Sequence, residues 1–227
     1  MAVKDWVVDY AYRAKAGLTF KRSVPKHYLG FTKENKIPVI LLPGISLKWH
    51  FLKQLGNKIS LVGHPVYVAK RLGRNLLSVD TSAELVHRLI VEQDLRNVII
   101  VGHSKGGLIG KQLLAHYNKD GRIKSVIAIA TPFSGTRLAG IVPHKAFKEM
   151  TSGSTSITNL HDQGHVNKHV YSIIPAYDNH IWHETGSYLK GAENIIIPVN
   201  GHHKIVFDKT VEKKVLEILS KLSKGRK

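Results

Sequence analysis

The amino-acid sequence predicts an α/β fold, in which one mostly parallel sheet of about six strands carries helices on both faces. The length of 227 residues suits a single domain, 1–227, with a sizeable buried core. Short runs that are apolar throughout alternate with segments of helical periodicity, a pattern typical of a parallel sheet covered on both sides. No apolar run reaches membrane-spanning length.

The chain opens with a predicted helical extension over residues 1–35. Trp6, Val7, Tyr10 and Ala14 fall roughly on one face of this helix. The simpler interpretation is a helix that packs on the core. The alternative is a helix on a membrane surface, which the Trp, Tyr and Lys content favours slightly.

The strands and helices that follow are predicted from the same alternation. Six apolar runs predict strands, at 37–42, 65–69, 98–101, 126–130, 170–174 and 195–199. Four periodic segments predict helices, at 47–59, 78–94, 108–117 and 209–222. The irregular stretch 135–168 predicts a small cap or lid, because a bare loop of that length is unusual.

Composition limits the function classes. With 34 Lys and Arg against 16 Asp and Glu, the net charge of +18 attracts anions. The basic residues are spread along the chain, so we expect a solvated basic surface, with an anionic membrane surface as the alternative partner. No nucleic-acid motif is recognisable, and the oligomeric state is left open.

The absence of cysteine excludes disulfides and thiolate catalysis. No signal segment is recognisable, so a cytoplasmic location is expected.

The segment Gly102-His103-Ser104-Lys105-Gly106 matches the G-x-S-x-G pattern between a predicted strand and a predicted helix. A tight turn there would present the Ser104 hydroxyl as a nucleophile, and glycines would let strand and helix approach. The backbone N–H of Lys105, at a helix start, is a predicted oxyanion donor. The second predicted donor is the backbone N–H of Ile45, after Gly44.

A serine nucleophile needs a histidine base and an orienting carboxylate, which follow it in the order acid, then histidine, in this kind of site. Asp178 is the preferred acid, because it follows an apolar run and so lies at the carboxyl end of a strand. Asp162 ranks second and Glu184 third.

His202 is the preferred base, with His203 as the alternative. Both follow the last predicted strand and precede the last helix. The histidine that is not the base is expected at the surface. His103 is expected to point away from the serine, because neighbours on a tight turn diverge.

Other histidines are interpreted as non-functional. His161, His165 and His169 recur every four residues and could bind zinc, but Gly164 interrupts the segment and no carboxylate is placed to orient the rings. No metal site is therefore predicted. His180 and His183, near Asp178, could line the cleft, but the preferred interpretation is that they face solvent.

Four segments carry a family resemblance. Pro43-Gly44-Ile45 is similar to an oxyanion loop of the form His-Gly-x, and 102–106 to a nucleophile elbow. Thr131-Pro132-Phe133-Ser134-Gly135 is similar to Thr-Pro-His-x-Gly, and 191–202 to a final strand with its histidine loop. On these segments the chain resembles the lipase and esterase branch of the α/β-hydrolase superfamily, especially small bacterial lipases.

The resemblance implies an α/β-hydrolase fold and hydrolysis of carboxylic esters or lipids through an acyl-enzyme, without a cofactor. It places Ser104, Asp178 and His202 on the catalytic positions. Two departures matter: Pro43 replaces a histidine, and Lys105 stands where many lipases carry Met or Gln. The Lys105 cation points either to an anionic or polar acyl substrate or to a side chain that reaches solvent. The alternatives are acyl transfer in the same site and a non-catalytic basic protein that binds lipid or nucleic acid.

Overall fold

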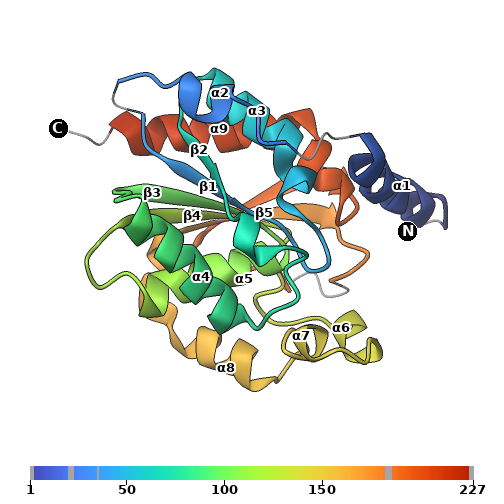
Figure 1. Ribbon diagram of the computed structural model, residues 1–227. Coiled ribbons are helices and arrows are strands. Elements are labelled where there is room, and N and C mark those ends of the chain that lie inside the picture. The colour runs from blue at the N-terminus through green and yellow to red at the C-terminus, as the bar shows by residue number, and fades with distance from the viewer. Residues whose placement is uncertain (1–2, 20–22, 35, 182–185, 225–227) are drawn as a thin grey trace.

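The centre of the fold is a parallel sheet of six strands in the order β2-β1-β3-β4-β5-β6 (Figure 1). The structure is a computed structural model that describes residues 3–19, 23–34, 36–181 and 186–224. Every neighbouring pair of strands is parallel. The strands are β1 (Val39–Leu42), β2 (Val66–Val68), β3 (Val98–His103), β4 (Ile123–Ile129), β5 (Val170–Tyr177) and β6 (Glu193–Asn200). The predicted fold class and all six predicted strands are confirmed.

The inner strands are buried on both faces, which is why their sequences are apolar throughout. Side chains alternate between the faces along a strand. Val39 and Leu41 of β1 therefore pack into one hydrophobic cluster, and Ile40 and Leu42 pack into the other.

Helices cover both faces of the sheet. In Figure 1, α3 (Lys53–Leu61) and α9 (Lys209–Lys224) lie on one side, and α4 (Val79–Glu92) and α5 (Lys105–His116) lie on the other. The 3-10 helix η1 (Trp49–Leu52) leads directly into α3, so the predicted helix at 47–59 consists of two kinds of helix. The side chain of Ser78 caps α4 by accepting a hydrogen bond from the backbone N–H of Thr81, 3.0 Å away.

The N-terminal segment forms α1 (Val3–Thr19) and the short helix α2 (His27–Gly30). The predicted packing of α1 on the protein is confirmed, but the predicted face is wrong. Val7 is 65% exposed, whereas Asp9 and Ala16 are fully or almost fully buried. A carboxylate, and not an apolar stripe, therefore marks the inner face of this helix.

The segment 135–168 contains α6 (Leu138–Ile141), α7 (Lys145–Lys148), α8 (Thr155–Asp162) and the 3-10 helix η3 (Gly164–His169). It is thus helical and not a bare loop. In Figure 1, α6 and α7 lie near the end of the sheet at which α1 also lies. Within the described ranges, no helix is both long and apolar enough to cross a membrane.

Candidate active site

Ser104 occupies a strained turn between β3 and α5. Its backbone has φ 52 and ψ −121, a conformation that non-glycine residues rarely adopt. A Cβ on Gly102 would overlap the backbone of Gly106, and a Cβ on Gly106 would overlap the carbonyl of Leu42. The glycines of the motif therefore allow the close approach of strand and helix that the sequence predicts. Ser104 lies between the last residue of β3 and the first residue of α5.

Asp178 and His202 form a buried pair at the carboxyl ends of β5 and β6. Nδ1 of His202 lies 2.9 Å from Oδ2 and 3.1 Å from Oδ1 of Asp178. Oδ1 also accepts hydrogen bonds from the backbone N–H groups of His180 (2.8 Å) and Ile181 (2.9 Å). The carboxylate is thus held rigidly, and it fixes the His202 ring with Nδ1 as the donor.

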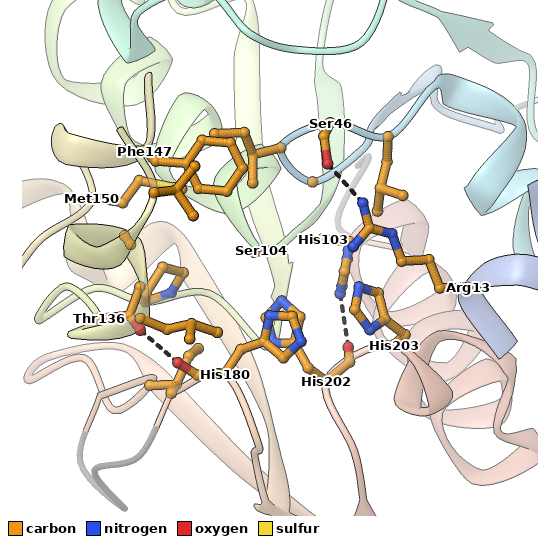
Figure 2. A pocket seen from close by; sticks show the side chains of 18 of the residues that line it. Arg13, Ser46, His103, Ser104, Thr136, Phe147, Met150, His180, His202 and His203 are labelled. Carbon is orange, nitrogen blue, oxygen red and sulfur yellow. Dashed lines mark hydrogen bonds between the residues drawn. The ribbon is translucent and has the colours of Figure 1, made fainter. Parts of the chain in front are cut away.

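Ser104 and His202 line one cavity of about 290 Å³, into which both side chains face (Figure 2). The three residues preferred from the sequence therefore come together, although 74 and 98 positions separate Asp178 and His202 from Ser104. The second-ranked acid, Asp162, is exposed on α8, and its Oδ1 lies 3.9 Å from Nδ1 of His161. Glu184 and His183 lie outside the described residues.

The prediction that the unused histidine lies at the surface is wrong. His203 is 3% exposed, and its Nδ1 lies 2.8 Å from Oδ2 of Asp9 on α1. Oδ1 of Asp9 also accepts hydrogen bonds from the backbone N–H groups of His203 (2.7 Å) and Lys204 (2.8 Å). Asn179 donates to Oδ2 over 3.1 Å. Sequence analysis missed Asp9, since it precedes the serine and lies on a helix expected to present apolar residues.

Asp9 is ionised in this setting. Burial by itself raises the pKa of its carboxyl, but the hydrogen bond and charge of His203, with the two backbone N–H groups, outweigh burial and bring the pKa below its ordinary value. Asp9 therefore holds the segment that carries both histidines as a buried carboxylate with four donors.

Two further histidines surround His202, contrary to expectation. His103 lines the same cavity, and its Nε2 donates to the backbone carbonyl of His202 over 2.8 Å. His180 stacks on His202, with ring centroids 4.4 Å apart and planes 7° apart. Burial, followed by the charges of the neighbouring histidines, lowers the pKa of both His103 and His180. Both rings therefore stay neutral around His202.

The predicted oxyanion loop lies against the serine. A Cβ on Gly44 would lie 3.2 Å from Cβ of Ser104, and Ile45 lines the cavity. The Nδ2 of buried Asn75 holds this loop by donating to the carbonyl of Pro43 over 2.7 Å. Asn75 is a second residue that sequence reasoning missed.

The Lys105 side chain reaches neither solvent nor substrate, so both interpretations of it were wrong. It is fully buried, and its Nζ donates to the backbone carbonyls of Asn75, at 3.2 Å, and Leu77. Burial lowers the pKa of this ammonium to about 8. The side chain therefore braces the start of α5 against the loop at 75–77.

The cavity has two unlike sides. Figure 2 shows Phe147 and Met150 on one side of Ser104 and Arg13 and Ser46 on the other. The side of Phe147 and Met150 is apolar, and Leu138, Ala139 and Val142 also line the cavity. An acyl chain would be covered by the apolar side.

One group of side chains could hold a metal ion. Ligand atoms of Asp9, His180 and His203 lie within 4.8 Å of one another. The Asp9 carboxylate already accepts four hydrogen bonds from protein donors, so this group is complete as a structural clamp.

Comparisons with known proteins place this geometry in a family. A family model described as a PGAP1-like alpha/beta domain matches residues 72–188. No curated protein matches the chain. The mature lipase BlEst2 of Bacillus licheniformis is a similar solved structure, with a TM-score of 0.69 and 15% identity over 84% of this chain and 95% of that one.

Two further solved structures share the fold. Lipase B of Aspergillus fumigatus has a TM-score of 0.67 and 18% identity over 87% of this chain and 55% of that one. A thermophilic esterase of Thermogutta terrifontis has a TM-score of 0.58 and 13% identity over 82% and 90%. The chain has the α/β-hydrolase fold and belongs to the family of PGAP1-like α/β domains.

Proposed function

We propose that this protein hydrolyses a carboxylic ester of a small molecule or lipid through an acyl-enzyme. The observation that carries the proposal is the buried hydrogen bond of 2.9 Å between His202 and Asp178, at a cavity that also exposes Ser104 in a strained turn. A folding role alone gives no reason to strain the backbone at a serine that faces a cavity.

In the first half of the reaction, the Ser104 hydroxyl attacks the ester carbonyl while Nε2 of His202 takes the hydroxyl proton. Asp178 keeps Nδ1 protonated and stabilises the imidazolium that forms. The backbone N–H groups of Ile45 and Lys105 would hold the negative oxygen of the tetrahedral intermediate. The C–O bond to the alcohol then breaks, and the alcohol leaves with the proton from His202.

In the second half, water attacks the acyl group on Ser104, and His202 again takes a proton. Collapse of the second intermediate releases the carboxylic acid and returns the proton to Ser104. The neutral His103 and His180 rings beside His202 support this cycle, because no second imidazolium opposes the positive charge that His202 acquires.

The direct test uses p-nitrophenyl esters of several chain lengths and a fluorophosphonate probe. We expect wild-type protein to release p-nitrophenol and to be labelled, and Ser104→Ala to do neither. Thr131→Ser, which keeps the hydroxyl that bonds the Ser104 carbonyl over 3.1 Å, serves as a fold-preserving control. A wild-type protein that is inert to every ester and to the probe would overturn the proposal.

A further inference from the structure

A second, basic cavity adjoins the candidate active site. It has a volume of about 330 Å³ and is shared by α1, the loop after β1, the start of η1 and the segment before α4. Its lining residues are Arg13, Ala16, Gly17, Ser46, Leu47, Lys48, His50, Phe51 and Arg74. Three of them are cations at neutral pH, and none of the lining residues carries a carboxylate. We call this cavity the basic recess.

The basic recess and the catalytic cavity share a wall. Arg13, Ser46 and Leu47 line both. Arg13 is half-buried, and its Nη2 donates to Oγ of Ser46 over 2.9 Å. Ser46 directly follows Ile45, the proposed oxyanion donor. The two cavities therefore lie on either side of the Arg13–Ser46 hydrogen bond, and a molecule bound at Ser104 would reach the recess by passing this pair.

The cations of the recess are not neutralised by the protein. In the described part of the chain, Arg13, Lys48 and Arg74 form no ion pair with a carboxylate. Arg71, only three positions from Arg74, pairs with Glu92 at 2.8 Å. Charges gathered around a concavity without counter-charges favour an anionic ligand, and guanidinium groups suit phosphate and carboxylate.

We propose that the basic recess binds an anionic group, a phosphate or carboxylate, on the alcohol part of the ester that Ser104 cleaves. The inference rests on the proposed function. The apolar side of the catalytic cavity lies across Ser104 from Arg13, so the acyl chain and the anion occupy opposite sides of the reacting carbonyl (Figure 2). The recess is thus a specificity site for the leaving alcohol.

The test compares 1-octanoyl-glycerol with 1-octanoyl-glycerol 3-phosphate, which share the acyl chain and differ in the anion. We expect kcat/KM for the phosphate ester to be about tenfold higher or more at low salt, with the preference shrinking as salt screens the exposed cations. Arg74→Gln should reduce the preference about threefold, and Lys48→Gln with Arg74→Gln about tenfold. Arg71→Gln removes the same charge outside the recess and should leave the preference intact.

Turnover and binding separate the two proposals. If wild type cleaves both esters equally and Arg74→Gln changes nothing, the recess proposal is wrong and the proposed function stands. If wild type cleaves neither of these esters, the p-nitrophenyl esters and the fluorophosphonate probe decide on the proposed function, and calorimetry with Ser104→Ala decides on the recess. Tighter binding of the phosphate ester, lost in the variant that also carries Arg74→Gln, supports the recess, whereas equal binding overturns it. Free glycerol 3-phosphate distinguishes recognition of the anion alone from recognition of the whole ester.

Discussion

Two adjacent histidines each meet a buried carboxylate, yet the two carboxylates bind different parts of the chain. His202 lies 2.9 Å from Asp178, and His203 lies 2.8 Å from Asp9. Asp178 accepts a hydrogen bond from the His202 ring. The backbone N–H of His202 donates instead to Oδ1 of Asn179, 2.9 Å away. Asp9, in contrast, binds both the His203 ring and the backbone N–H groups of His203 and Lys204.

The difference teaches how to tell a chemical pair from a structural one. The distance between the carboxylate oxygen and the imidazole nitrogen is nearly the same in both pairs, 2.9 and 2.8 Å. A carboxylate that also accepts backbone N–H groups of the histidine's own loop fixes that loop, and its loss frees main-chain donors inside the protein. Asp178 also accepts backbone N–H groups, but they come from His180 and Ile181 in its own loop. Of His202 it binds only the ring, so it sets the ring's tautomer and orientation. The variants below break or sharpen this comparison.

The largest effect is expected from removing the two histidines in turn. His202→Ala should lower kcat by about 10⁴-fold or more, because the general base is lost, while the melting temperature changes by only a few degrees. His203→Ala should keep measurable activity but unfold at a clearly lower temperature. Initial rates and calorimetric melting curves on the same preparations check both, and the reverse pattern would exchange the roles of the two histidines.

Removing Asp9 should be the most destabilising change. Asp9→Ala leaves two backbone donors, one imidazole and Asn179 without their acceptor, and loss of one partner of a buried pair typically costs about 3–5 kcal/mol. For a domain of this size, that is a fall of about 10 °C in melting temperature. Asp9→Asn, which keeps one carbonyl acceptor for the backbone donors, is the matched control and should lose less. Equal melting of wild type and Asp9→Ala would refute the clamp.

Acid should weaken the fold through the neutral histidines. Burial lowers the pKa of His203, His180 and His103, so below their ordinary value of 6.5 the unfolded chain binds more protons than the folded one. Stability is therefore present above about pH 6.5 and is lost as the pH falls. The lowered pKa of Asp9 adds a further loss only below its ordinary value of 3.8. Melting temperatures between pH 7.5 and 5.5 should fall for wild type and fall less steeply for His180→Phe.

The smallest effect is expected at another acid–histidine pair, which Asp162 and His161 form on α8. Their atoms are 3.9 Å apart, but the side chains are 68% and 81% exposed. Asp162→Ala should leave kcat unchanged and move stability by less than about 0.5 kcal/mol. A large loss of activity in Asp162→Ala, with Asp178→Ala active, would transfer the role of the acid to α8.

Local pattern was enough for much of the fold and for the preferred site residues. The inner strands β1, β3 and β4 are short, apolar and buried on both faces, so each can be recognised from a few residues of sequence. The glycines around Ser104 indicate that neighbouring segments approach closely. Asp178 and His202 were selected because each follows the end of a predicted strand. These features depend on residues near one another in the chain, or on the rule that active sites gather at the carboxyl ends of strands.

What could not be predicted depends on contacts between distant segments. Asp9 reads as a surface residue of an amphipathic helix until a partner 194 positions away is in place. From the sequence, Lys105 is interpreted as a cation near solvent. Its acceptors are the backbone carbonyls of residues 75 and 77, and every residue has such a carbonyl, so no residue type in the sequence indicates them. His103 and His180 were assigned outward positions for the same reason.

The same clamp sets an order of events for the growing chain. Asp9 is synthesised before all of its partners: Asn179 comes between β5 and β6, and His203 and Lys204 come after β6. Until His203 and Lys204 are made, the Asp9 carboxylate lacks three of its four donors, and burying that charge with so few hydrogen bonds is costly. Docking of α1 is therefore expected to follow synthesis of the segment after β6, and the loop of His202 becomes fixed only when α1 and this segment have met.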